Sequence, residues 1–411
     1  MITRSISHSS RLAVQRLFRA LGIIRARDQH RRSVSLAPRN NPRGRVLLSY
    51  IIDPFLLRPG EEIANGHTHH WESAEIGRLF LERDYAIDVI SYRNTSFMPN
   101  RTYDVFVSAR TNLQQIAERL NSNCIKVAHL DTAHWIENNR AAYGRLNDLK
   151  HRRGIVLHDP KLFEQSWAIE HADIATALGN EYTIATYRYA KKPIYRIPIS
   201  TPAIYDWPVT KSFSNCRLNF IWFGSAGFVH KGLDLVLEAF AGLPKHKLTV
   251  FGPLESEPDF CRAFHRELYE TENIHAYGWI DVESASFRDQ MNNAISLVYP
   301  SCAEGGGGSV LSCMHAGVIP ILTPSSSVDL NGSGIELDQC NVDAIRAAVE
   351  DLSAKPEEEL RALSLATWKQ ARAYHTRERF SDTYGLFIDT VLAPMIAERS
   401  NLNRVRTDQV T

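Results

Sequence analysis

Apolar runs alternate with amphipathic stretches along most of the chain, and they form two series. Apolar runs without a polar alternate position are typical of strands that are buried on both faces, and intervening helices cover such a parallel sheet. A helix is expected over 68–84. The strands of the first series are expected at 46–52, 86–92, 103–109 and 124–130, with extensions at 153–159 and 172–178.

The second series begins after a proline-spaced connector at 198–209 and predicts another doubly wound unit. Its strands are expected at 218–224, 246–252, 274–278, 295–300 and 318–322, and its helices at 232–243, 258–270, 285–294 and 309–316. A helical run over roughly 366–398 closes the pattern.

The predicted fold class is α/β, with two doubly wound, Rossmann-like parallel-sheet domains that face a cleft. A chain of 411 residues exceeds one ordinary core. Ligands of open α/β sheets bind beyond the carboxyl ends of the strands, so the cleft is the expected binding site. The expected parts are a leader at 1–45, a first domain at 46–205, a second at 206–375, and a C-terminal helix and tail at 376–411 that pack back on the first domain.

Composition narrows the class of protein. An apolar content of 44% and a charged content of 23% are typical of a globular, water-soluble chain. The six cysteines are scattered and form no CxxC pair, which argues against a disulfide framework and fits a reducing, cytoplasmic compartment. No apolar run reaches eighteen residues, so no membrane span is expected.

The leader is strongly basic although the whole chain has a net charge of only +1. Residues 1–45 hold eleven Arg and a single acid, Asp28, so the remainder is acidic. Helical spacing of apolar residues near 14–21 fits a basic amphipathic helix within residues 1–30 on an anionic membrane surface. A disordered tail and a targeting segment are the alternatives. Residues 35–44 are expected to form a linker.

Four consecutive glycines follow Glu304 at the junction of an expected strand and helix. Glycines let the backbone fold tightly against a ligand, and a helix N-terminus adds a partial positive charge. Together these features form a receptor for phosphate or diphosphate. Glu304 repels phosphate and is suited to neutral hydroxyl groups, so a sugar phosphate is the expected ligand. A flexible linker is the alternative.

A second strand-to-helix turn carries Gly224, Lys231 and Gly232 at the expected cleft. Lys231 is expected in the first turn of the helix, where a cation opposes the helix dipole. A cation in an unfavourable position suggests a phosphate partner. A solvated lysine is the alternative.

Residues 218–322 resemble the nucleotide-binding domain of GT-B glycosyltransferases, specifically family 4, also called glycosyl transferases group 1. The resemblance rests on the Gly224 and Lys231-Gly232 turn and on the Glu304 loop with Met314 and Gly317. It implies a GT-B fold and catalytic roles for Lys231 on the donor phosphates and Glu304 on the sugar. The implied donor-binding residues are Gly224, Ser225, Gly278, Trp279, Gly305, Gly306, Gly307, Gly308, Ser309 and Ser312.

Two positions depart from the family pattern. Ser225 stands where the family usually has an arginine, and Ser312 stands where it usually has a second glutamate that grips the ribose. A neutral hydroxyl is the weaker partner at either position. These departures motivate an alternative, a catalytically degenerate GT-B protein that binds a nucleotide or stabilises a partner.

The first domain is expected to supply the acceptor side of the cleft. Gly66 and His67 follow the first strand, and His129 and Asp131 follow another. The resemblance implies that a histidine near position 129 contacts the transferred sugar, with His134 as the rival. The neighbouring His69 and His70 have no acid or cysteine at ligand spacing, so no metal is expected.

The resemblance implies a hexosyl- or related glycosyltransferase, which retains anomeric configuration and needs no cofactor. The expected partners are a nucleotide-sugar donor, a glycan or lipid-linked acceptor of the cell-envelope or polysaccharide type, and no nucleic acid. A cytoplasmic location is expected, with attachment to the inner face of a membrane through the leader as the further option. A GT-B epimerase or phosphorylase is a third possibility.

Overall fold

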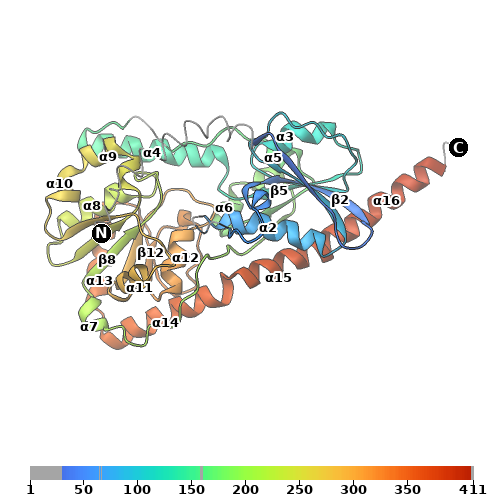
Figure 1. Ribbon diagram of the computed structural model, residues 1–411. Helices are drawn as coiled ribbons and strands as arrows, with labels where there is room; N and C mark the ends of the chain where they lie inside the picture. Colours follow the sequence, from blue (N-terminus) through green and yellow to red (C-terminus); the bar gives the residue numbers. More distant parts are fainter. Residues whose placement is uncertain (1–29, 64, 66, 158–160, 409–411) are drawn as a thin grey trace, which may run out of the picture.

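The computed structural model describes residues 30–63, 65, 67–157 and 161–408. Two α/β lobes lie side by side, each built around one mostly parallel sheet (Figure 1). The expected fold class is confirmed. The amphipathic helix expected in the leader falls on residues 1–29, outside the described residues, and stays a prediction.

The sheet of the first lobe has seven strands in the order β1-β3-β2-β4-β5-β6-β7. All neighbouring pairs are parallel except β1 and β3, which are antiparallel. The strands are β1 (Ser33–Leu36), β2 (Gly44–Tyr50), β3 (Tyr85–Ser91), β4 (Val105–Ala109), β5 (Ile125–Leu130), β6 (Ile174–Ala177) and β7 (Ile194–Arg196).

The edge strand β1 lies inside the expected leader and overlaps the start of the expected linker, so both expectations are wrong over residues 33–36. Its four residues pair with β3, with Ser33 opposite Ile90, so the linker expected at 35–44 begins inside a strand. The Ser35 hydroxyl donates to Asp88 Oδ1 over 2.5 Å. Exposed and half-buried positions alternate along β1, and such a short edge strand has no continuous apolar run by which it could be recognised.

The sheet of the second lobe has six parallel strands in the order β10-β9-β8-β11-β12-β13. The chain order reverses between β8 and β11, and such a switch point leaves a crevice at the carboxyl ends of the strands. The strands are β8 (Asn219–Phe223), β9 (Lys247–Phe251), β10 (Ile274–Gly278), β11 (Ser296–Tyr299), β12 (Ile319–Leu322) and β13 (Ile335–Glu336).

Helices cover both sheets and close the chain. In the first lobe they are α2 (Thr68–Leu81), α3 (Asn112–Ile116), α4 (Trp135–Arg153), α5 (Ala168–His171) and α6 (Glu181–Ala185). In the second they are α7 (Phe213–Cys216), α8 (Leu233–Ala241), α9 (Pro258–Ala263), α10 (His265–Tyr269), α11 (Ala285–Asn292), α12 (Gly308–His315) and α13 (Val342–Ala354). The expected terminal run is three helices, α14 (Glu357–Tyr374), α15 (Arg377–Phe387) and α16 (Ala393–Asp408), with one π-turn (Ile388–Leu392) between the last two.

The strand expected at 153–159 is wrong over its described residues. Arg153 ends helix α4, and Gly154 caps it in the left-handed conformation with a φ of 67°. The Gly154 amide still donates to the Lys150 carbonyl as the last helical bond, and its left-handed φ then turns the backbone out of the helix. Residues 155–157 form no strand.

Helices also tie the two lobes together. α4 starts beside the first sheet and reaches α8 of the second lobe, where the Arg152 guanidinium bonds Asp234 Oδ2 over 2.7 Å. The terminal helices α14, α15 and α16 run the other way, from the second lobe to the first (Figure 1). There α15 packs against α2, and Arg83 forms two bonds to Asp389 of 2.6 and 2.7 Å. One continuous apolar core includes side chains from both sheets.

Candidate active site

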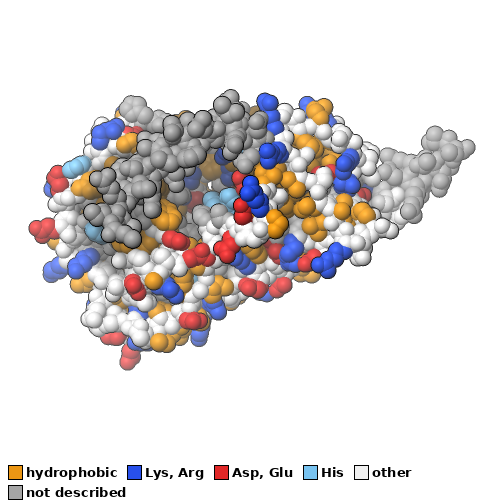
Figure 2. All heavy atoms as spheres, viewed as in Figure 1, with side chains coloured by type: hydrophobic (Ala, Val, Ile, Leu, Met, Phe, Trp, Pro, Cys, Tyr) orange, Lys and Arg blue, Asp and Glu red, His pale blue; other side chains and the backbone are white. Residues whose placement is uncertain are grey.

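A cleft of about 1390 Å³ separates the lobes. Its walls are the residues that follow β2, β3, β4 and β5 in the first lobe and β8, β9, β10 and β11 in the second. Histidine side chains are visible where the surface is hollowed between the lobes (Figure 2). The carboxyl ends of both sheets therefore open onto one site, as the topology requires.

The second lobe places Lys231 and Glu304 in contact at the cleft. The Lys231 ammonium donates to Glu304 Oε1 over 2.6 Å and to the Tyr299 hydroxyl over 2.9 Å. Tyr299 and Ser301 each donate to the same Oε1 atom over 3.0 Å. Among the described residues, no hydrogen bond ends on Glu304 Oε2. One carboxylate oxygen is thus fixed, and the other is available to a ligand.

The pair is held in its charged form. Burial alone would lower the pKa of Lys231, but the adjacent carboxylate raises it above its usual value. Burial alone would raise the pKa of Glu304, but Lys231, Lys161 and His230 together lower it below its usual value. The site therefore presents an ion pair, not a neutral acid and amine, at every physiological pH.

The expected position of Lys231 in the first helical turn is wrong. Gly232 is the N-cap of α8 with a φ of 74°, so Lys231 precedes the helix. A side chain at 232 would collide with Pro300, because a Cβ there would lie 2.6 Å from the Pro300 carbonyl oxygen. The partner that stabilises the Lys231 charge is Glu304.

The glycine loop lines the cleft and also joins the lobes. A Cβ on Gly305 would lie 2.1 Å from the Thr132 Cα and 2.2 Å from the Asp131 carbonyl oxygen, so the first lobe approaches this backbone too closely for a side chain. Gly306 and Gly308 line the cleft, whereas Gly307 is buried and packs near Val310. The Gly308 amide donates to the Gly306 carbonyl over 3.0 Å, whereas the next two amides of α12, those of Ser309 and Val310, have no described acceptor and can bind an anion.

The remaining expected donor-binding residues divide into two groups. Gly224 and Ser225 after β8, Trp279 after β10, and Ser309 and Ser312 on α12 line the cleft. Gly278 ends β10 with a φ of 89° and is absent from the described lining. Ser312 is buried, and its hydroxyl donates to the Gly308 carbonyl over 3.0 Å, so only its lone pairs remain for a ligand.

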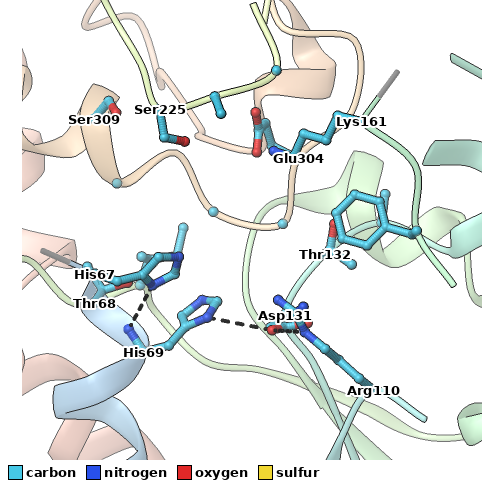
Figure 3. A pocket seen from close by; sticks show the side chains of 18 of the residues that line it. His67, Thr68, His69, Arg110, Asp131, Thr132, Lys161, Ser225, Glu304 and Ser309 are labelled. Atoms are coloured by element: carbon cyan, nitrogen blue, oxygen red, sulfur yellow. Dashed lines mark hydrogen bonds and ion pairs between the residues drawn. The ribbon is translucent and has the colours of Figure 1, made fainter. Parts of the chain in front are cut away.

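The first lobe contributes an ionic cluster. Buried Asp131 accepts a hydrogen bond from Arg110 Nε over 3.1 Å, and His69 Nδ1 lies 3.6 Å from the same carboxylate (Figure 3). Burial raises the pKa of Asp131, but Arg110 and the nearby histidines lower it below its usual value. His67 caps α2 by accepting from the His69 amide over 3.3 Å and also lines the cleft. Gly66 lies outside the described residues.

His129 and its rival His134 occupy different surroundings. His129 is the penultimate residue of β5 and lines the cleft. Its Nδ1 shares a 2.8 Å hydrogen bond with Thr176, and the buried Nε2 has no described partner. Burial lowers the pKa of His129 to about 4, so the ring is neutral at pH 7. His134 caps α4, and its Nε2 lies 3.0 Å from the Tyr189 hydroxyl.

Several side chains in the site were not predicted, because no motif or spacing in the sequence marks them as functional. Tyr299 and Ser301 are common residues at the end of a strand, yet both bind Glu304. Arg110 has a φ of 63° after β4, and Lys161 comes from an irregular segment of the first lobe. Only the tertiary fold brings these residues to the cleft. Within the described residues, no group of three or more His, Cys, Asp or Glu side chains is placed to hold a metal ion.

The family comparison falls on the second lobe. Residues 217–355 match the family Glycosyl transferases group 1. This match covers the segment 218–322, confirms the resemblance described above and supports a glycosyltransferase as the class of enzyme. No curated protein matches the chain in sequence.

Solved structures match over both lobes. Sucrose-phosphate synthase from Thermosynechococcus elongatus is 14% identical with a TM-score of 0.59, over 86% of this chain and 100% of that one. WaaG, a glycosyltransferase involved in lipopolysaccharide biosynthesis, is 14% identical with a TM-score of 0.50, over 84% and 99%. These matches confirm the GT-B fold. TarM is 15% identical with a TM-score of 0.48 over 68% of this chain, which spans only 54% of the TarM chain.

Proposed function

We propose that this protein is a glycosyltransferase that moves a sugar from a nucleotide-sugar donor to a carbohydrate-type acceptor with retention of anomeric configuration. The observation that carries the proposal is the Lys231–Glu304 pair beside the glycine loop, at the carboxyl ends of two facing sheets. This arrangement supplies a cation, backbone donors and a carboxylate within one cleft, which are the groups that a sugar diphosphate requires.

The departing diphosphate is the group that the second lobe stabilises. Lys231 and the first amides of α12 face the space where negative charge develops as the bond to the sugar breaks. Fixed donors in a partly closed cleft stabilise such charge without having to reorganise. The leaving phosphate then accepts the proton of the acceptor hydroxyl, so the mechanism requires no separate protein base.

Glu304 orients the transferred sugar. Its Oε1 atom is saturated by Lys231, Tyr299 and Ser301, which leaves Oε2 to accept hydrogen bonds from sugar hydroxyls. Neutral His129 lines the cleft, and its buried Nε2, which has no described partner, is proposed to make a further hydroxyl contact. Mobile substrate hydroxyls are thereby held in one orientation, which lowers the entropy cost of reaching the transition state.

The acceptor enters from the first lobe. Asp131, with His67 and His69, lies across the cleft from Glu304 (Figure 3). A carboxylate and imidazoles recognise hydroxyl-rich molecules, so a glycan or a lipid-linked sugar is the proposed acceptor. The likeness to WaaG, a glycosyltransferase involved in lipopolysaccharide biosynthesis, favours an acceptor of the cell-envelope type.

The test is donor turnover with a panel of UDP-, GDP-, ADP- and TDP-sugars, followed by mass spectrometry of the released diphosphate and the glycoside. Lys231→Met and Glu304→Gln are each expected to lower turnover by about 100-fold or more, because each removes a charge that acts on the transition state. Lys245→Met, an exposed lysine outside the cleft, is the matched control.

The possible results separate the hypotheses. Undiminished turnover in both variants would overturn the assignment. Tight nucleotide binding without loss of the sugar would favour the degenerate binding protein, which Ser225 and Ser312 motivate. The anomeric configuration of the product, read by NMR, tests retention directly.

Attachment to an anionic membrane through residues 1–29 is a separate part of the proposal. No described helix combines the length and apolarity needed to cross a bilayer. Because residues 33–36 belong to the sheet, the informative deletion ends at residue 29 and spares β1. The deleted protein is expected to leave anionic liposomes in a flotation assay, and unchanged partitioning would end this part of the proposal.

A further inference from the structure

Lys161 brings a second ammonium to the donor side of the cleft. Its side-chain stem packs on Gly227, where a Cβ would lie 2.6 Å from Lys161 Cδ. The side chain runs toward Glu304 (Figure 3), and it interacts electrostatically with both Glu304 and Lys231. The first lobe thus sends one cation across the cleft to the anion-binding face of the second.

The local charge balance makes this cation important. Lys231 is paired with Glu304 at 2.6 Å, so the pair as a whole has no net charge and the carboxylate partly offsets the attraction of Lys231 for a diphosphate. Lys161 adds the positive charge that the pair lacks. The residue at the tip of the adjacent β8 loop, Ser225, is neutral and lines the same wall.

No other described cation is placed to take this role. Arg110 is held by Asp131 on the opposite wall, and the Arg93 guanidinium donates to the Tyr92 hydroxyl over 2.9 Å. Neutral His129 offers no charge. Lys161 and Lys231 are the two lysines of the described lining, and only Lys231 has a carboxylate partner at ion-pair distance.

The backbone next to Lys161 is anchored. The Asn139 side chain on α4 accepts from the Phe163 amide over 2.8 Å and donates to the Phe163 carbonyl over 3.0 Å. This two-bond clamp fixes the segment two residues after Lys161 to a helix that joins both lobes. The backbone from which the Lys161 side chain extends is therefore held at the cleft before a ligand arrives.

We infer that Lys161 binds the diphosphate of the donor directly and serves as the phosphate-facing cation that Ser225 does not supply. This inference rests on the proposed function. It makes donor binding depend on both lobes, since Lys231 and the glycine loop come from one and Lys161 from the other.

The test measures binding of nucleoside diphosphates, not turnover. UDP, GDP, ADP and TDP are titrated into the full-length protein by calorimetry, and the tightest binder is taken forward with its nucleoside. Lys161→Met keeps the stem on Gly227 but removes the charge, so the diphosphate is expected to bind about 10- to 100-fold more weakly. The nucleoside is expected to bind equally well, and Lys245→Met is the control.

Restoring the positive charge by a second substitution distinguishes a diphosphate-binding role of Lys161 from a structural role. Lys161→Arg is expected to retain affinity, and adding Ser225→Arg to Lys161→Met is expected to restore most of it, because a cation returns to the same wall. A loss that Ser225→Arg does not restore, together with a lowered melting temperature for Lys161→Met, would assign Lys161 a packing role and overturn the inference.

A pH profile gives an independent readout. Burial, and next the charge of Lys231, lowers the pKa of Lys161 to about 8 in the free protein. Diphosphate affinity is therefore expected to fall between pH 7 and 9 in the wild type and to stay flat in Lys161→Arg, whose guanidinium remains charged.

Groups that face Lys161 titrate elsewhere. The pKa of Lys231 is raised and the pKa of Glu304 is lowered by their mutual contact. Burial lowers the pKa of His230 to about 4 and raises the pKa of Cys302 to about 12. His67 and Glu257 also interact electrostatically with Lys161. Burial lowers the pKa of His67 to about 4 and raises the pKa of Glu257 above its usual value. A wild-type profile as flat as that of Lys161→Arg would contradict the inference.

The two failures are distinguishable. If no diphosphate binds the wild type, the proposed function fails. If the wild type binds and Lys161→Met binds equally well, only the inference about Lys161 fails.

Discussion

At the scale of single residues, Gly305 shows how one position serves both the ligand site and the joint between lobes. The backbone of the first lobe at Asp131 and Thr132 occupies the space that any side chain at 305 would need. Both contacts are main-chain atoms, which cannot rotate away as a flexible side chain can. Glycine at this position is thus dictated by contact between the lobes as well as by the anion pocket.

Gly305→Ala is expected to destabilise the protein by about 1–3 kcal/mol, because the lobes must separate to admit the methyl group. Donor turnover is expected to fall in parallel, since the same loop lines the cleft. The matched control is Gly144→Ala on α4, where a Cβ would meet open space and helix propensity favours alanine. Thermal melts compare the two variants, and a Gly305→Ala protein as stable and active as the wild type would contradict the argument.

A second residue-scale feature is the buried carboxyl group of Glu72 on α2. Its Oε1 accepts from the Ser200 amide over 3.1 Å and from the Ser200 hydroxyl over 2.8 Å. The buried Oε2 accepts no described hydrogen bond and lies 4.0 Å from His69 Nε2. Burial raises the pKa of Glu72 to about 7 despite the Ser200 hydrogen bonds. The native state therefore holds a proton that the unfolded chain releases at a lower pH.

Between pH 4.5 and 7, the native state binds more protons at Glu72 than the unfolded chain does, so the free energy of unfolding falls as the pH rises. The whole change amounts to about 3 kcal/mol. Glu72→Gln keeps the acceptor for Ser200 and removes the titration. The stability of Glu72→Gln relative to wild type is thus expected to rise by about that amount from pH 5 to 8. Denaturant titrations measure it, and a constant difference would refute the assignment.

At the scale of elements, α4 acts as a strut between the lobes. Its C-terminal turn carries Arg152, which bonds the fully buried Asp234 of α8 over 2.7 Å and Glu238 over 3.0 Å. Arg153 beside it bonds Glu267 over 2.7 Å. Basic residues at a helix C-terminus also interact favourably with the helix dipole. One helix end thus docks onto the second lobe through ion pairs that are partly removed from water.

Arg152→Met is expected to cost about 3 kcal/mol, because it leaves Asp234 buried without its nearest cation. Arg140→Met on the same helix is the matched control, since Arg140 pairs with Glu137 at the surface and such pairs contribute about 1 kcal/mol or less. Adding Asp234→Asn to Arg152→Met is expected to recover part of the loss. Equal stability of the two arginine variants in urea would show that the strut does not depend on this ion pair.

Strands and helices with a clear hydrophobic pattern were predictable from the sequence, whereas strands that depend on contacts with distant segments were not. The predominantly apolar runs at 86–92 and 295–300 identify β3 and β11, because central parallel strands are buried on both faces. By contrast, β1 alternates weakly at an edge, and β13 spans only Ile335–Glu336. Such strands depend on a neighbour already in place, which no local pattern reports.

The same distinction holds for the candidate site. Glu304, Lys231 and the glycine loop stand at strand ends in a recognisable spacing, so the sequence could place them at the cleft. Lys161 reaches it from an irregular segment, only through the tertiary fold. Arg110 and Tyr299 also stand at strand ends, but no sequence pattern predicts that Arg110 pairs with Asp131 or that Tyr299 and Ser301 bind Glu304 Oε1. Residues that complete the electrostatics of a site from irregular segments have no periodic signal.

At the scale of the whole molecule, each lobe depends on a helix from the other. The strut α4 leaves the first lobe for the second, whereas α15 crosses back and buries Phe380 and Tyr384 in the core. That core includes side chains of both sheets without interruption. Reciprocal docking of this kind couples the stabilities of the two lobes.

The two lobes are therefore expected to unfold in one cooperative transition, with fluorescence and circular dichroism giving the same midpoint. A nucleoside diphosphate at about 100 times its dissociation constant should raise the free energy of that single transition by about 2.7 kcal/mol. Arg152→Met, which loosens the strut, should separate the two probes if α4 carries the coupling, whereas Arg140→Met should not. Two resolved transitions in the wild type, of which the ligand moves only one, would show that the cleft lies between independent domains.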